Sequence, residues 1–258
     1  MPSMIVLNAK RTRKLPGVRS PKLVEARARR AIDSLMAPML ADVAARLAGL
    51  DSMTRIADVI LALREAQEVW ERAFSWKAEG LAGRWALDVD VIAKEKLGRA
   101  VGKALGIDMA MILDAPDVAV SVRLASMEAA DLIRKIPTDY IGRISRAVYQ
   151  SMRQQPFPEG RTLAEEIRLI GGFAEERAQV IARDQTSKMN TNINQIRQTA
   201  LGIQEYIWRT SEDSRVVGAP GGKYPQGNAM HGNHYVRNGK IFRWDEPPDD
   251  GHPGWPIQ

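Results

Sequence analysis

Apolar residues recur at helical spacing through most of the chain, from residue 21 to residue 201. The pattern begins at Ser20-Pro21, where a serine can cap a helix and a proline suits its first turn. In the first helix the spacing predicts these inward positions: Leu23, Ala26, Ala31, Leu35, Leu40, Val43 and Leu47. A second stripe comprises Ile56, Val59, Ile60, Leu63, Ala66, Trp70 and Phe74. Such stripes are typical of a helical bundle.

Glycine and proline divide this pattern into several predicted helices. We expect Pro38 to kink or split the first helix, because proline cannot donate the backbone hydrogen bond. Gly80 is expected to close the second helix, and Pro137 to separate two later ones. Gly171-Gly172 predicts one further break.

Two short sequences predict helix ends more specifically. Thr162-Leu163-Ala164-Glu165 has the pattern of a capping box, in which the Thr and Glu side chains bond each other's backbone N–H groups. Gly202 follows the last helical stretch and is expected to stop it.

The pattern changes to short β-type runs after residue 204. Glu205–Thr210 is rich in aromatic and β-branched residues and predicts a strand. His234–Arg237 and Lys240–Trp244 flank Asn238-Gly239, which predicts a hairpin with a type I′ turn. The predicted fold class is therefore mainly α, a multi-helix body with a small C-terminal β-hairpin module.

Changes in composition and charge along the sequence indicate where its segments begin and end. Residues 211–258 contain 8 of the 20 glycines, 6 of the 14 prolines and all three histidines. The 258 residues carry a formal charge of +6, and residues 1–30 hold nine basic side chains against Glu25 alone. We therefore predict a basic N-terminal arm (1–20), a helical body (21–204) and a small C-terminal module (205–258).

The N-terminal charge indicates an anionic partner, either nucleic acid or an acidic protein face. The candidate binding residues are Lys10, Arg11, Arg13, Lys14, Arg19 and Lys22. The alternative is a solvated arm that only aids solubility.

Candidate catalytic chemistry is sparse. His231, His234 and His252, with one of Asp213, Asp249 or Asp250, could hold a metal ion for a nuclease. We favour the alternative that these histidines hydrogen-bond loop backbone, because no helix fixes their spacing. The chain has no cysteine, no phosphate-binding loop and no Gly-x-Ser-x-Gly elbow. No cofactor, metal or enzyme activity is predicted, and no apolar run reaches the roughly 20 residues that span a bilayer.

Motifs in the last third of the chain occur in a fixed order. They are Ala182-Arg183-Asp184-Gln185-Thr186, Gly202-Ile203, Tyr206, Trp208-Arg209-Thr210, Asp213-Ser214-Arg215-Val216, His234, the run from Gly239 through Phe242 and Trp244 to Pro247-Pro248, and Gly251-His252-Pro253-Gly254. Over residues 165–258 this order resembles the phage Mu protein F-like family of minor head, or head morphogenesis, proteins of tailed phages. The chain departs from the family at Val217, where the family has arginine, and in the Gly-rich insertion of residues 218–232.

The resemblance implies a low-copy structural protein of the phage head, located in the virion and in the host cytoplasm during assembly. Members associate with the portal ring, enter the procapsid and in some phages leave with the DNA. The implied partners are the portal protein, the major capsid or scaffold protein, and packaged DNA bound without sequence specificity. Trp208, Phe242 and Trp244 would then be core residues, and Asp213, Arg215 and His234 would form a polar network.

Overall fold

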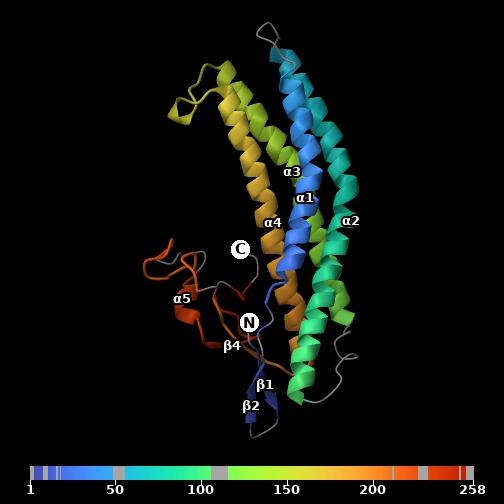
Figure 1. Ribbon diagram of the computed structural model, residues 1–258, viewed down its shortest axis with the longest axis vertical. Helices are drawn as coiled ribbons and strands as arrows, with labels where there is room; N and C mark the ends of the chain where they lie inside the picture. Colours follow the sequence, from blue (N-terminus) through green and yellow to red (C-terminus); the bar gives the residue numbers. More distant parts are fainter. Residues whose placement is uncertain are drawn as a thin grey trace. The chain divides into compact units, whose positions relative to one another are not determined.

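The fold is dominated by long helices. The computed structural model describes residues 3–7, 11–15, 17, 19–48, 56–105, 116–210, 212–225, 232–249 and 251–253 (Figure 1). The long helices are α1 (Lys22–Ala48), α2 (Ile56–Leu105), α3 (Pro116–Met152) and α4 (Leu163–Ala200). The short elements are β1 (Ser3–Leu7), β2 (Arg11–Lys14), the 3-10 turn η2 (Pro158–Gly160), β3 (Glu205–Ile207), α5 (His234–Arg237) and β4 (Ile241–Arg243). The prediction of a mainly α fold with a small β part is confirmed.

The predicted ends and splits inside the helices are wrong, whereas a kink of α1 at Pro38 stays a prediction. Helix α1 continues through Pro38, α2 through Gly80, α3 through Pro137 and α4 through Gly171-Gly172. A glycine costs a helix about 1 kcal/mol and a proline about 3 kcal/mol. Burying one large apolar side chain recovers about 1.5–3 kcal/mol. Buried residues on either side of each break therefore outweigh it, such as Met36 and Met39 around Pro38, and Ile170 and Ala174 around Gly171-Gly172.

The buried face of α1 also differs from the predicted one. Its buried residues are Val24, Ala28, Ile32, Met36, Met39 and Val43. Of the predicted stripe only Val43 is fully buried, and Leu23 is 73% exposed. Apolar residues lie on more than one face of α1, so their spacing alone did not select the face that packs.

The chain divides into two compact units that do not follow the predicted segments. The helical unit comprises Leu23–Trp85 and Ser126–Gln185. The sheet unit comprises Met1–Lys22, Ala86–Ala125 and Thr186–Gln258. Helices α2, α3 and α4 each contribute one part to each unit.

Polar contacts join neighbouring helices inside the helical unit. The Trp70 indole donates to Asp42 Oδ2 at 2.7 Å, which links α2 to α1. The Thr138 hydroxyl donates to Glu71 Oε1 at 2.7 Å, which links α3 to α2. Gln185 Nε2 donates to Glu128 Oε1 at 3.1 Å, which links α4 to α3. In this unit, each helix therefore packs beside the helix that follows it in the sequence.

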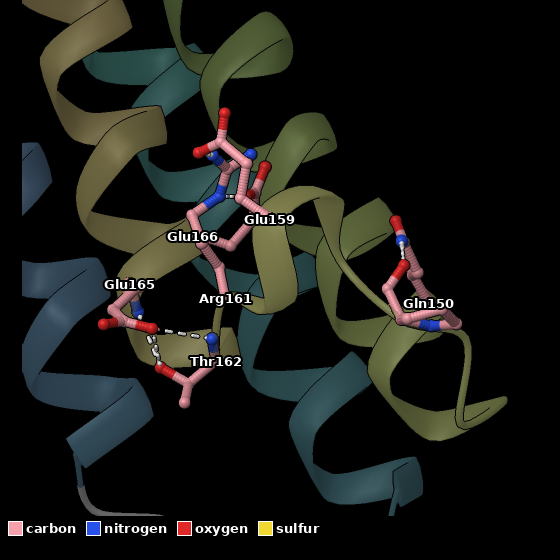
Figure 2. A network of polar contacts seen from close by, with 7 residues as sticks. Gln150, Glu159, Arg161, Thr162, Glu165 and Glu166 are labelled. Carbon is pink, nitrogen blue, oxygen red and sulfur yellow. Dashed lines mark hydrogen bonds and ion pairs between the residues drawn. The ribbon is translucent and has the colours of Figure 1, made fainter.

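The predicted capping box forms at the start of α4 (Figure 2). The Thr162 N–H donates to Glu165 Oε2 at 2.7 Å, and the Glu165 N–H donates to the Thr162 hydroxyl at 3.3 Å. The Glu165 carboxylate accepts bonds from the Thr162 N–H and, at 2.9 Å, from the Thr162 hydroxyl, and these two bonds lower its pKa. Arg161 binds Glu159 at 2.9 Å and Glu166 at 3.0 Å, so the α3–α4 connection is held on both sides of the cap.

The sheet unit contains a four-stranded antiparallel sheet in the order β2-β1-β3-β4. Strand β1 pairs with β2 and also with β3, with Ser3 opposite Tyr206 and Met4 opposite Glu205. The segment predicted as a basic arm thus supplies two of the four strands, with the basic strand β2 at one edge.

The predicted hairpin between residues 234–237 and 240–244 does not form. Strand β4 pairs instead with β3, with Tyr206 opposite Phe242. His234–Arg237 is a single helical turn, capped by Asn233, whose Oδ1 accepts the Val236 N–H at 3.1 Å.

The turn at Asn238-Gly239 is of type II. Asn238 has φ −56° and ψ 124°, Gly239 has φ +83°, and Lys240 N donates to Arg237 O at 2.9 Å. A type I′ turn would need positive φ at both central residues. Gly239 has the positive φ expected of a turn glycine, but the turn joins the helical turn α5 to the strand β4.

Candidate functional site

The end of α4 positions the motif residues. Gly202 has φ +76°, its N–H donates to Thr199 O at 2.9 Å, and the Ile203 N–H donates to Gln198 O at 2.8 Å. This pair of bonds is a Schellman motif, which ends a helix with a glycine in the left-handed region. The fully buried Ile203 packs with Leu15, Leu97 and Val101. The predicted stop at Gly202 is confirmed, and the chain is directed into β3.

Five rings gather on β3, β4 and the segment that follows β4. We call Tyr206, Trp208, Phe242, Trp244 and His252 the aromatic–histidine cluster. The Tyr206 ring centroid lies 4.3 Å from that of Trp244 and 5.4 Å from that of His252. Phe242 lies 5.9 Å from Tyr206 and 5.6 Å from Trp208. Tyr206, Trp208, Trp244 and His252 are buried, and Phe242 is partly buried.

Three hydrogen bonds fix the polar atoms of this cluster. His252 Nδ1 lies 2.8 Å from the Tyr206 hydroxyl, and His252 Nε2 lies 3.1 Å from Trp244 O. A carbonyl oxygen can only accept, so Nε2 carries the proton and Nδ1 accepts from Tyr206. The Trp244 indole donates to Gln198 Oε1 at 3.2 Å, which joins the cluster to α4. Burial lowers the pKa of His252, partly offset by its bond to the Trp244 carbonyl.

His234 and Arg237 contact the cluster, and Asp213 and Arg215 contact each other. His234 stands 5.2 Å from the Trp208 ring, and the Arg237 guanidinium lies 5.1 Å from the same ring. Asp213 and Arg215 bind each other, with Nη2 to Oδ2 at 2.6 Å, which raises the pKa of Arg215. Of the predicted polar network, the observed contacts include the Asp213–Arg215 ion pair and the His234–Trp208 ring contact.

The remaining motif residues have varied surroundings. Arg183 is exposed on α4. Pro247 and Pro248 follow β4 outside regular structure, and Gly251 N donates to Pro248 O at 2.7 Å. Pro253 is half-buried beside His252, whereas Gly254 lies outside the described residues.

Of the basic residues proposed to bind an anionic partner, those that the structure describes lie on β2, in the segment after it and at the start of α1. Arg11, Arg13 and Lys14 belong to the edge strand β2, and Lys10 lies outside the described residues. Arg19 is exposed, and its carbonyl accepts a bond from Lys96 Nζ at 3.2 Å. Lys22 is the exposed first residue of α1.

The proposed metal ligands can be compared with this geometry. In the described part of the chain, no three His, Cys, Asp or Glu side chains are grouped as a metal site. His231 and Asp250 lie outside the described residues. Both ring nitrogens of His252 are engaged, one by Tyr206 and one by Trp244. His252 could ligate a metal only after losing one of these bonds.

Sequence reasoning missed the buried polar face of α4. Arg197 is 1% exposed and binds Asp90 Oδ1 of α2 at 2.7 Å. Asn190, Asn194 and Gln198 are also buried on this helix. Charged and amide residues are ordinarily assigned to the solvent side. The recurrence of polar residues at positions 190, 194, 197 and 198 was a helical stripe that could have been read as buried.

We predict that His252 makes the sheet unit less stable in acid. The folded state holds His252 neutral with a lowered pKa, whereas the unfolded chain titrates near the ordinary value of about 6.5. As the pH falls below about 6.5, the unfolded state takes up the proton first, so the free energy of unfolding decreases until the folded pKa is reached. Urea unfolding at pH 7.5 and pH 5.5 measures this loss.

The matched control is His252→Gln, which keeps His234 and removes only the buried imidazole. The decrease between the two pH values should be smaller in this variant. An equal decrease in both proteins would contradict the assignment to His252.

The chain is similar to one distant relative among known proteins. No family model and no solved structure matches the chain. A protein of Haemophilus influenzae, described as uncharacterized, is 29% identical over 196 residues, which cover 75% of this chain and 40% of that relative. The chain therefore spans about two fifths of the relative's length. No described helix combines the length and the apolarity needed to cross a membrane.

Proposed function

We propose that the chain is a minor head protein of a tailed phage that acts in head morphogenesis and is not an enzyme. In this proposal it sits inside the capsid, with the portal protein as its main partner. The major capsid or scaffold protein and packaged DNA are further partners. The proposal rests on the resemblance of residues 165–258 to the Mu F-like family.

The observation that carries the proposal is the convergence of motif residues on one packed core. Tyr206, Trp208, Phe242, Trp244 and His252 are spread over about 50 residues of sequence, yet their rings contact one another. Residues that bury rings and satisfy each other's polar atoms stabilise a fold. Such a role supports an assembly protein over the alternative, a metal-dependent nuclease that uses His231, His234 and His252.

Quantitative mass spectrometry of virions and procapsids from the source phage tests this function. We expect the chain at low copy relative to the major capsid protein in both particles. Its absence from both would contradict the virion role. A plasmid-cleavage assay with Mg²⁺, Mn²⁺ or Zn²⁺ tests the alternative, because cleavage that is lost in His234→Ala would establish the nuclease instead.

The proposed DNA contact can be tested at the basic segment by removing charge only. Deletion of the segment would also remove β1, which pairs with β3. We expect the combined substitutions Lys10→Gln, Arg11→Gln, Arg13→Gln and Lys14→Gln to weaken binding to duplex DNA. The slope of log K against log salt should fall by about 0.9 for each lost phosphate contact. A salt titration with an unchanged slope would remove DNA as the partner of this segment.

A further inference from the structure

A groove lies between α3 and α4 in the helical unit. Helix α3 contributes Ile136, Tyr140, Arg143 and Arg146. Helix α4 contributes Ile170, Phe173, Arg177 and Val180, and the hollow between them has a volume of about 470 Å³. Each set spans eleven residues of its helix, and the ten rises of about 1.5 Å between the first and the last make the groove about 15 Å long. This is a different surface from the aromatic–histidine cluster.

The groove has an apolar floor and partly exposed apolar edges. Ile136, Tyr140 and Ile170 are buried, whereas Phe173 is 50% exposed and Val180 is 42% exposed. Leu169, one helical turn before Phe173, is 43% exposed. An apolar floor between two adjacent helices is the shape that a third, amphipathic helix fills.

Three arginines line the groove without a carboxylate partner among the described residues: Arg143, Arg146 and Arg177. The Arg143 guanidinium lies 5.7 Å from the Phe173 ring, a cation–π contact that holds it at the groove. A helix that covers the groove would remove water from these guanidinium groups. Carboxylates on that helix would then be needed to compensate for the lost hydration.

The charge of the groove differs between its two ends. Gln185 contacts Glu128, and Phe173 contacts Arg143, so α3 and α4 run antiparallel. This register places Asp139, Glu176 and Arg177, which all line the groove, at about the same level, where the two carboxylates outnumber the one guanidinium. Arg143 and Arg146 lie toward the other end, near Phe173 and Ile170. An occupant should therefore be acidic at one end and basic at the other.

The connection between α3 and α4 supports a preformed groove. Arg161 is paired with Glu159 and Glu166, and the Gln150 amide donates to Pro156 O at 2.9 Å (Figure 2). These bonds fix the chain reversal just beyond the Arg146 end. A preformed groove loses less conformational entropy on binding than a flexible one.

We propose that this groove binds an amphipathic helix of a partner protein, with acidic residues against Arg143 and Arg146 and a basic residue against Asp139 and Glu176. The inference goes beyond the proposed function, since a helix-binding groove in the helical unit does not depend on a virion role. It assigns a binding surface to the part of the chain that lies outside the sheet unit.

The test is a displayed library of amphipathic helices of about 14 residues, long enough to span the groove. Their apolar positions are fixed at i, i+3, i+4 and i+7, and their flanking positions vary among Asp, Glu, Lys, Arg and Ser. Selection on the full chain should enrich acidic residues at one end and basic residues at the other. Recovered binders without this asymmetry, or no binders, would overturn the proposal.

Charge reversal then locates the contact. Fluorescence anisotropy with a selected peptide should show about tenfold weaker binding or more to Arg143→Glu/Arg146→Glu. A peptide whose acidic end is changed to lysine should bind this variant better than the original peptide does. The control, Arg64→Glu/Arg123→Glu, reverses two exposed arginines that do not line the groove and should bind the original peptide normally.

Two further outcomes would overturn the proposal. One is peptide binding that is unchanged by the reversal at Arg143 and Arg146. The other is arginine-dependent binding of a single-stranded oligonucleotide with no peptide binding, which would make the groove a nucleic-acid site. Circular dichroism of each variant verifies that the helices remain folded.

Discussion

Asp90→Ala is expected to destabilise the sheet unit by about 3 kcal/mol, more than Arg197→Met does. The Arg197 guanidinium is 1% exposed and donates to Asp90 Oδ1 at 2.7 Å and to the Asp90 carbonyl at 3.3 Å. Removing the carboxylate takes the Asp90 partner away from a buried cation, and breaking a buried ion pair in this way costs about 3–5 kcal/mol. We take the lower end because the Asp90 side chain is 23% exposed and water can reach this site.

The asymmetry between the two partners is the distinctive result. In Arg197→Met the remaining Asp90 carboxylate can turn to solvent. In Asp90→Ala the remaining Arg197 guanidinium is too deeply buried to do so. The double variant Asp90→Ala/Arg197→Met should therefore be more stable than Asp90→Ala alone. Urea unfolding and hydrogen exchange of the β3 amides measure both effects.

The control for this prediction is the pair of Asp131 and Arg134 on α3, in which the Asp131 side chain is 64% exposed and Arg134 also pairs with Glu79. Asp131→Ala should change the free energy of unfolding by less than about 1 kcal/mol. Additive losses in the double variant at positions 90 and 197 would show that the pair is not coupled as described.

Trp244→Ala is expected to be the most damaging substitution in the aromatic–histidine cluster. It removes a buried ring that lies 4.3 Å from Tyr206 and 5.0 Å from His252, and it removes the indole bond to Gln198. Truncation of a buried tryptophan costs about 3–5 kcal/mol. Loss of the ring also removes the contact with the His252 ring, although the bond from His252 Nε2 to the backbone carbonyl of residue 244 can persist.

Trp76 provides a matched control, because it is 83% exposed on α2. Trp76→Ala should change stability by no more than about 0.5 kcal/mol. Trp244→Phe separates the two contributions at position 244, since it keeps an aromatic ring and loses the hydrogen bond. Equal urea midpoints for Trp244→Ala and Trp76→Ala would refute a structural role of the cluster.

The sequence predicted those features that depend on local chemistry. The capping box at Thr162 and the glycine stop at Gly202 formed, because each depends on groups within a few residues. The strand predicted over residues 205–210 formed over Glu205–Ile207, although its partners β1 and β4 are distant in the sequence. The same local reasoning failed at Gly80 and Pro137. There, the packing of residues distant in sequence outweighed a local helix-breaking tendency.

Partners distant in sequence could not be predicted. The spacing around Asn238-Gly239 indicated a hairpin, but β4 found its partner in β3, about 35 residues earlier. The bond between His252 and Tyr206 and the pair of Arg197 with Asp90 also join separate segments. Residue type and periodicity identify surfaces that can pack, whereas the choice of partner depends on the whole fold.

The pairing of β1 with β3 has a consequence for protein synthesis. Ser3 and Tyr206 are neighbours in the sheet but about 200 residues apart in the chain. At about 5–20 residues per second, β1 leaves the ribosome roughly 10–40 s before β3 is made. Helices can form as they emerge, because their hydrogen bonds join residues four apart, but contacts of such long range form slowly. During this interval the β3-binding edge of β1 is open, and the sheet is completed only after translation has passed β4.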